Sequence, residues 1–114
     1  MSRITTHVLD TSRGRPAAGV AVTLEAQTDA GGWRAVGRGR TDADGRLKSL
    51  TGGGDDFVEG VYRLTFETGE YFAAQGEETF YPHAVVVFRV RASSEHYHVP
   101  LLVSPFGYST YRGS

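Results

Sequence analysis

The 114-residue sequence has no cysteine, one methionine, one tryptophan and four prolines. Without cysteine there is no disulfide, no thiolate ligand and no thiol nucleophile, so a nucleophilic mechanism has to use Ser, Thr, Lys or water. The absence of cysteine is compatible with reducing and oxidising compartments alike. A chain of this length buries enough surface to fold without a metal or disulfide. We therefore expect residues 1–114 to form one domain.

The sequence also lacks long hydrophobic runs and an excess of charge of either sign. No segment approaches the apolar length that a membrane-spanning helix needs, and Thr5, His7 and Asp10 interrupt the apolar core that a secretory signal requires. The 12 lysines and arginines nearly balance the 13 aspartates and glutamates and are scattered, whereas nucleic-acid binding favours a basic stripe. We therefore expect no nucleic-acid or membrane partner, and by default a cytoplasmic protein.

What is present indicates an all-β fold. Fifteen glycines, many valines, threonines and tyrosines, and few runs of strong helix formers favour short strands joined by tight turns. Turns are expected at 10–16, 29–32 and 41–45, a flexible connection at 51–56, and a short helix at 69–76. Alternating residues predict strands at 3–10, 20–26, 61–67, 85–90, 97–103 and 108–111, and further strands starting at Trp33 and Arg46. Seven to eight such strands favour a two-sheet β-sandwich.

Pro100 lies inside one of the predicted strands. Proline has no N–H to donate to a neighbouring strand. We therefore expect its strand to lie at a sheet edge or at a subunit interface.

The four histidines differ in their surroundings. His96 and His98 are two apart on a predicted strand and so share a face, which is a common metal-ligand spacing, with Tyr97 on the opposite face. Two ligands do not make a site, so we predict no metal, and we interpret His96 and His83 as ordinary surface residues. His98 precedes an apolar run and His7 lies within a strand, and such settings keep an imidazole neutral and able to accept a proton.

Three blocks of the sequence, residues 6–17, 41–46 and 96–114, occur in the order and spacing of a known family. With its final Tyr-Arg-Gly-Ser, the chain resembles the 5-hydroxyisourate hydrolases, the transthyretin-like enzymes of urate breakdown. The resemblance implies a transthyretin-like sandwich with one short helix. It also implies a homotetramer, a dimer of dimers formed through edge strands, with active sites at the dimer–dimer interface.

The resemblance further implies a reaction and a site. The family opens a cyclic amide of 5-hydroxyisourate with water, giving 2-oxo-4-hydroxy-4-carboxy-5-ureidoimidazoline, and uses no cofactor. A histidine base suits the water, and a guanidinium suits both a flat, acceptor-rich substrate and the charge that grows on the carbonyl oxygen. Which of His7 and His98 is the base stays open, with His7 narrowly favoured. The residues expected to act in catalysis are His7, Arg46, His98 and Ser114, and those expected to bind substrate are His7, Arg46, His98, Tyr111, Arg112 and Gly113.

Two other interpretations belong to different classes. A small-ligand carrier like vertebrate transthyretin shares the fold and the block at 57–60, but it lacks the counterparts of His7, Arg46 and His98 and the final tetrapeptide. An immunoglobulin-like adhesion domain fits the strand pattern and explains none of these clustered residues.

A prediction follows for the end of the sequence, where we expect the carboxylate of Ser114 to orient a histidine or arginine of the site. Residues appended after Ser114 should then reduce turnover and leave folding intact, because they displace that carboxylate. Activity assays and circular dichroism of proteins tagged at either end check this. Equal activity for the two tagged proteins would contradict it.

Overall fold

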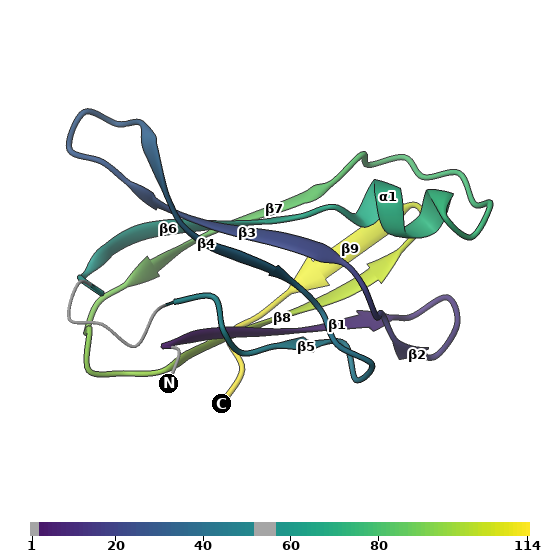
Figure 1. The fold of residues 1–114 in the computed structure, drawn as a ribbon, viewed down its shortest axis with the longest axis horizontal. Helices are drawn as coiled ribbons and strands as arrows, with labels where there is room; N and C mark the ends of the chain where they lie inside the picture. The colour runs from purple at the N-terminus through teal and green to yellow at the C-terminus, as the bar shows by residue number, and fades with distance from the viewer. Residues whose placement is uncertain (1–2, 52–56) are drawn as a thin grey trace.

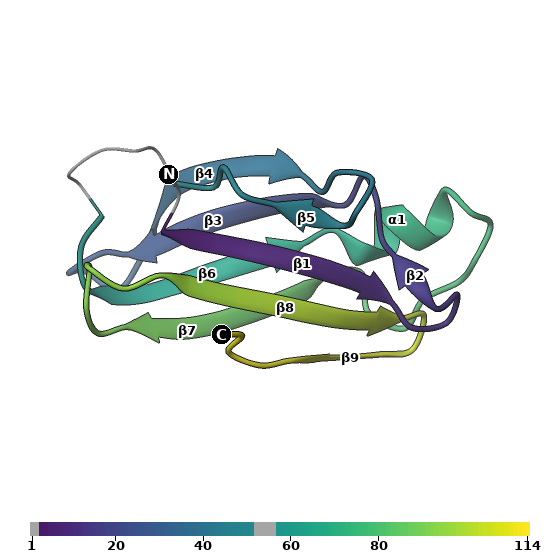
Figure 2. The same cartoon turned by 90° about the horizontal axis from the view of Figure 1, so that it is seen from below.

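A computed structural model describes residues 3–51 and 57–114, in which two β-sheets face each other (Figures 1 and 2). The first sheet has the order β2 (Arg15–Pro16), β1 (Ile4–Asp10), β8 (Tyr97–Ser104) and β9 (Gly107–Thr110), and β5 (Arg46–Leu47) also pairs with β1. The second has the order β4 (Trp33–Arg40), β3 (Ala21–Gln27), β6 (Gly60–Phe66) and β7 (Ala84–Val90). Helix α1 (Thr68–Ala73) follows β6. In the described part of the chain, no helix is long and apolar enough to cross a membrane.

The two-sheet β-sandwich and the short helix expected from the sequence are confirmed. The described residues contain nine strand segments, one more than the upper expectation, because Arg15 and Pro16 pair with Asp10 and Leu9 inside the segment expected to be a turn. Most of the connection expected at 51–56 lies outside the described residues.

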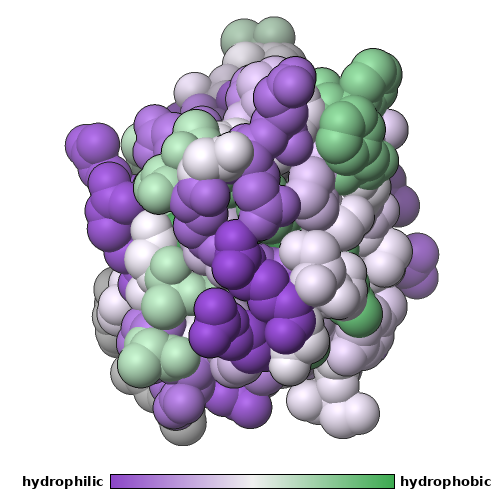
Figure 3. All heavy atoms as spheres, turned by 90° about the vertical axis from the view of Figure 1, so that its right-hand side faces the viewer, coloured by the Kyte–Doolittle hydropathy of each residue, from purple (hydrophilic) through white to green (hydrophobic). Residues whose placement is uncertain are grey.

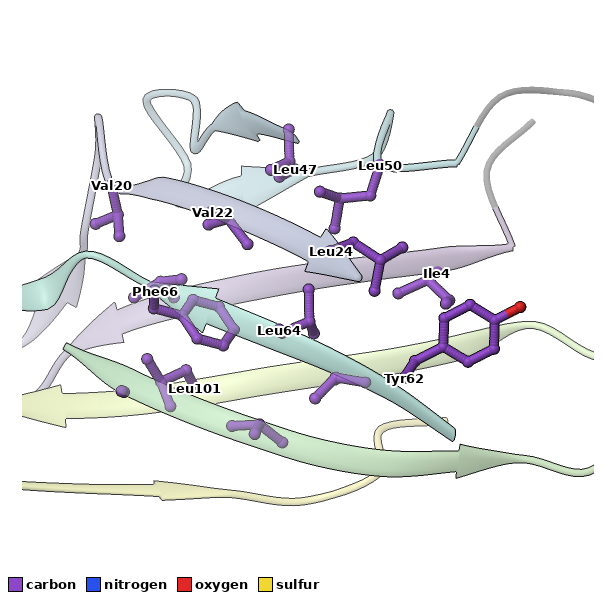
Figure 4. Close-up of a cluster of buried hydrophobic side chains, with 14 of the residues drawn as sticks. Ile4, Val20, Val22, Leu24, Leu47, Leu50, Tyr62, Leu64, Phe66 and Leu101 are labelled. Carbon is purple, nitrogen blue, oxygen red and sulfur yellow. The ribbon is translucent and has the colours of Figure 1, made fainter. Parts of the chain in front are cut away.

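The alternation of side chains separates an inner from an outer face in each sheet. On β1, Ile4, Thr6, Val8 and Asp10 are buried, whereas the residues between them are partly exposed. The inner faces meet in one core of aliphatic and aromatic side chains (Figure 4). The largest of the fully buried side chains are Tyr62, Phe66, Phe72, Ile4, Leu24, Leu50, Leu64 and Leu101.

For Pro100 the expectation of an edge strand is wrong, whereas the alternative, a subunit interface, stays a prediction. Its strand, β8, lies between β1 and β9. Strand β8 pairs with β9 from Ser104↔Gly107 to Leu101↔Thr110. Beyond that, the C-terminal segment pairs with β8 again only through the single bridge His98↔Gly113. Pro100 lies in this gap, so its missing N–H interrupts the pairing locally and does not force the whole strand to an edge.

Asp10 is the buried carboxylate that closes the turn after β1. It is fully buried, and it accepts hydrogen bonds from the Ser12 hydroxyl at 2.6 Å, from the Tyr71 hydroxyl at 2.8 Å and from the Ser12 and Arg13 backbone N–H groups. Burial raises the pKa of Asp10, but the hydrogen bonds from Ser12, Tyr71 and Arg13 outweigh it, so the net pKa lies below its ordinary value of 3.8. The carboxylate therefore ties β1 to helix α1.

We expect Asp10→Asn to lower the free energy of unfolding by about 2 kcal/mol, because an amide nitrogen would meet groups that now donate to a charged oxygen. The depressed pKa means that this stabilisation is complete above pH 3.8 and is lost as the pH falls through the folded-state pKa. Urea unfolding from pH 7 to pH 2 measures both effects, with Asp29→Asn in an exposed turn as the matched control. A loss below about 0.5 kcal/mol at pH 7 would refute the prediction.

Candidate active site

The outer face of the first sheet brings together four of the residues singled out from the sequence. Strands β1 and β8 run parallel with Thr5 opposite His98, and β5 places Arg46 opposite His7. The segment after β9 returns alongside β8, where the Gly113 N–H donates to the His98 carbonyl at 2.8 Å. Figure 2 views the side on which β1, β5 and β8 lie together with the C-terminal end. Two imidazoles, one guanidinium and a glycine backbone thus share one region.

Arg46 and His7 are both placed by the turn at 42–45. One oxygen of Asp42 accepts from the backbone N–H groups of Asp44 and Arg46, each at 2.9 Å, and the hydrogen bond from Arg46 is the chief reason that the pKa of Asp42 is lowered. Gly45 takes a φ of +76°, which favours glycine, within the turn expected at 41–45. Its carbonyl accepts from the Val8 N–H at 2.7 Å, which fixes the turn against β1.

The same turn determines which nitrogen of His7 carries a proton. Nε2 of His7 lies 2.9 Å from the backbone carbonyl oxygen of Asp44. A carbonyl only accepts, so Nε2–H is the donor and, in the neutral ring, Nδ1 is bare. Nδ1 of His7 is therefore the nitrogen that can accept a proton.

His98 is held on two sides. Its Nδ1 lies 2.8 Å from the Thr5 hydroxyl, and a Cβ added at Gly113 would lie only 2.7 Å from Cδ2 of the ring. A side chain at position 113 would therefore displace the imidazole. The structure gives Gly113 a steric role next to His98 that the sequence resemblance did not specify.

The electrostatic surroundings keep His98 neutral. Partial burial lowers the pKa of His98 below its ordinary 6.5, and the positive charge of Arg46 and the nearby His7 and His96 rings lower it further. His98 is half-buried, as its position before an apolar run suggests. At neutral pH this imidazole can act as a proton acceptor.

Sequence reasoning missed Thr5 and underestimated His96. Nε2 of His96 lies 3.1 Å from the same Thr5 hydroxyl that contacts His98, and the two histidine rings are nearly parallel, with centroids 6.5 Å apart. His96 is exposed, as expected, yet it belongs to this cluster. The alternation on β1 places Thr5 on the face of His7, but only the pairing with β8 brings it to His98.

The rest of the C-terminal tetrapeptide is not gathered around the histidines. The guanidinium of Arg112 lies over the Tyr97 ring, 4.5 Å from its centroid, and contacts Glu95 at 3.3 Å. Tyr97 faces the core side of β8, opposite to His98. Tyr111 and Ser114 are exposed, and neither makes a side-chain hydrogen bond within the described residues.

A cavity of about 350 Å³ lies elsewhere, between β7 and the end of β9. Val87, Phe88, Tyr97, Tyr111 and Arg112 are among the side chains that line it. Its described lining includes none of His7, Arg46 and His98, so the chemistry-bearing residues lie on an open sheet face outside this cavity.

The cluster suits proton transfer and the binding of a planar, acceptor-rich molecule. The two imidazoles present ring nitrogens that accept or donate hydrogen bonds, and the Arg46 guanidinium supplies a fixed positive charge with donors in one plane. The described residues contain no group of three metal-ligating side chains.

We expect His98 to titrate below pH 6.5, and Arg46→Gln to raise its midpoint, because removal of a neighbouring positive charge makes protonation easier. NMR titration of the histidine ring resonances measures both values. Arg34→Gln, an exposed arginine on β4 of the other sheet, is the matched control and should leave the midpoint unchanged. A wild-type midpoint above 6.5 would contradict this account of the site.

Comparison with known proteins agrees with this architecture. A model of the HIUase/Transthyretin family matches residues 4–113. A Salmonella typhimurium protein named 5-hydroxyisourate hydrolase is 47% identical over 111 residues, which cover 97% of this chain and 80% of that protein. The structure of Klebsiella pneumoniae 5-hydroxyisourate hydrolase is similar with a TM-score of 0.83 and 37% identity, covering 97% of this chain and 98% of that one.

A sea bream transthyretin solved in complex with thyroxine is similar with a TM-score of 0.91 and 37% identity, covering 97% of this chain and 94% of that one. The transthyretin-like fold expected from the sequence is thereby confirmed. Because the family model spans nearly the whole chain, the protein belongs to the HIUase/Transthyretin family.

Proposed function

We propose that this protein is a 5-hydroxyisourate hydrolase, in which residues 1–114 form one hydrolase domain. The observation that carries the proposal is the convergence of His7, Arg46 and His98 on the outer face of the first sheet. Relatives that carry the name 5-hydroxyisourate hydrolase and match almost the whole chain support it.

The reaction is attack of water on a cyclic amide carbonyl, which opens the ring to give 2-oxo-4-hydroxy-4-carboxy-5-ureidoimidazoline. The attacking water has to lose a proton, the carbonyl oxygen gains negative charge, and the leaving nitrogen needs a proton. A neutral imidazole takes up the first proton and, once protonated, gives it to the leaving nitrogen. The Arg46 guanidinium orients the flat substrate and stabilises the negative charge, since charge-assisted hydrogen bonds are strong in such a setting.

Both histidines are suited to act as the base, through different nitrogens. The Asp44 carbonyl fixes His7 with Nε2–H, so Nδ1 is the accepting atom. His98 has its Nδ1 engaged by Thr5, and its Nε2 makes no hydrogen bond within the described residues. The lowered pKa of His98 supports a neutral, proton-accepting ring at this position at neutral pH. We propose that both histidines act in catalysis: one activates the water, and the other positions the water or the substrate.

Gly113 leaves the space that His98 occupies. Tyr111, Arg112 and Gly113 stay predicted contacts of the substrate, and Ser114 stays a predicted catalytic residue. For Arg112 to reach the substrate, its guanidinium has to leave Glu95 and the Tyr97 ring. The Arg112–Glu95 pair is exposed, with side-chain exposures of 58% and 54%, and such pairs are held only weakly.

We also propose that the chain assembles as a dimer of dimers. Strands β7 and β9 each form one edge of their sheet, and Val85, Val87 and Tyr108 are exposed on them. Edge strands with exposed apolar side chains are suited to pairing with another chain. Tetramer formation would bring the face with His7 and His98 to a dimer–dimer interface.

The end of the molecule with α1 offers a second apolar surface. Figure 3 shows hydrophilic atoms across the middle of this end and a compact hydrophobic patch at its upper right. Phe80 and Phe106, in loops that meet where the Phe80 N–H donates to the Pro105 carbonyl, are 67% and 68% exposed. Exposed phenylalanines of this kind favour a further contact between copies of the chain.

The cytoplasmic location stays a prediction from the sequence.

A carrier without catalysis is the second candidate, because the sea bream transthyretin with thyroxine is also similar in structure. A carrier has no use for paired proton acceptors. The neutral His98 ring and the Arg46 guanidinium on one open face therefore favour hydrolysis.

The decisive measurement is the ultraviolet decay of 5-hydroxyisourate, generated in situ from urate by urate oxidase. We expect the protein to accelerate the decay, and His7→Ala and His98→Ala each to reduce turnover by about 100-fold or more, because a general base or its partner is lost. His83→Ala, at an exposed position before β7, is the matched control and should retain activity.

Sedimentation and circular dichroism establish that each protein tested is a folded tetramer. Decay no faster than the spontaneous reaction, from a folded tetramer without a C-terminal tag, would overturn the hydrolase and favour the carrier. Full turnover in a His7→Ala/His98→Ala double variant would remove the proposed site.

A further inference from the structure

A hydroxyl-bridged histidine pair lies beside the proposed site. We propose that Thr5 is a positioning residue for His98: its hydroxyl accepts a hydrogen bond from Nδ1–H of His98 and donates its own hydrogen to Nε2 of His96. Nε2 of His98 is then bare and ready to accept a proton. The role of this arrangement in catalysis rests on the proposed hydrolysis, whereas the tautomer of His98 can be measured without substrate.

The geometry of the three groups carries the inference. The Thr5 oxygen lies 2.8 Å from Nδ1 of His98 and 3.1 Å from Nε2 of His96, so both contacts are within hydrogen-bond distance. The two rings are nearly parallel, at 16°. The parallel pairing of β1 with β8 puts Thr5 directly opposite His98, so this hydroxyl is held by strand pairing and does not depend on a loop.

A single hydroxyl hydrogen couples the two histidines. A threonine hydroxyl donates one hydrogen bond and accepts others. If it donates to His96, it accepts from His98, whose proton is then on Nδ1. If it donates to His98, the neutral ring carries its proton on Nε2 and cannot act as a base through that atom. The position of one hydrogen atom therefore decides whether Nε2 of His98 is able to activate water.

Two observations favour the first orientation. His96 is exposed, so its ring is free to present a bare Nε2 while water solvates its Nδ1. Nε2 of His98, the atom left bare, makes no hydrogen bond within the described part of the chain, so it is available to a water or substrate.

This arrangement also gives the two catalytic histidines complementary roles. The Asp44 carbonyl locks His7 with its proton on Nε2, and the Thr5 hydroxyl locks His98 with its proton on Nδ1. An oriented partner that holds the correct tautomer is what a general base requires, as in the triads of serine hydrolases. Thr5 contributes this orientation without adding a charge to the site.

The test is a direct determination of the His98 tautomer in the assembled protein labelled with ¹⁵N-histidine. Long-range ¹H–¹⁵N correlation spectra at pH 8, with no substrate present, should show the His98 proton on Nδ1. A bare Nδ1 in the wild-type protein would overturn the proposal.

Substitutions at Thr5 separate orientation from simple packing. Thr5→Val keeps the size and the preference for a β-strand, but it removes the acceptor, so the Nδ1–H population of His98 should fall. Turnover should fall by about 10-fold or more, with KM within about 2-fold, because the general base is lost from part of the population. Thr5→Ser restores a hydroxyl and should restore both the tautomer and kcat.

Matched variants complete the experiment. Thr23→Val lies on the outer face of the other sheet, at a similarly half-exposed strand position, and should change neither readout. His96→Ala removes the acceptor of the Thr5 hydrogen and should reduce the Nδ1–H population of His98. An unchanged tautomer in His96→Ala would remove His96 from the network, and wild-type kcat in Thr5→Val would overturn the positioning role.

The two proposals fail in distinguishable ways. A folded wild-type tetramer that shows Nδ1–H on His98 but does not accelerate decay of 5-hydroxyisourate would support the hydrogen-bond network and overturn the hydrolase. Acceleration by a protein whose His98 has a bare Nδ1 would support the hydrolase and overturn the network.

Discussion

The parallel pairing of β1 with β8 is the constraint on which the rest of this structure depends. It joins seven consecutive residue pairs, from Ile4↔Tyr97 to Asp10↔Val103. The pairing seals the first sheet over the core, because both strands turn alternate apolar residues inward. It also joins two segments about ninety positions apart in the sequence, so their outward residues become neighbours. Because strand periodicity is two, a shift of one residue would exchange the buried and exposed faces of β1.

The chemistry of the site follows from that register. Thr5 and His98 are opposite each other only in this alignment, and the gap in pairing at Pro100 leaves room for Gly113 to return to His98. Arg46 joins from the other side of β1, where the turn closed by Asp42 directs β5 along His7. Each group is held by backbone hydrogen bonds of the sheet. A site of this kind is built on strands, which place side chains more precisely than loops do.

The side chains of the site are held in place by the sheet although they are partly exposed to solvent. Its residues lie on the outer face of a sheet whose inner face is packed in the core, so the proposed catalytic side chains can be partly exposed without weakening that core. Such a face becomes an enclosed site only if another surface covers it. A dimer of dimers would supply that cover, and it would make catalysis depend on assembly. The exposed apolar residues on β7, on β9 and in the adjacent loops are consistent with this dependence.

Much of this protein was determined by local sequence. The alternation of apolar and polar residues determines which face of β1 carries His7. Asp42 and Gly45 specify their turn, because an aspartate side chain bonds nearby backbone N–H groups and glycine adopts a positive φ, and both tendencies can be recognised from the sequence. Tertiary structure decided the rest: Pro100 in an interior strand, Arg112 against Tyr97, and Thr5 between two histidines. The physical reason is that local patterns specify faces and turns, whereas contacts between distant strands depend on strand order and register, which are set by packing of the whole chain.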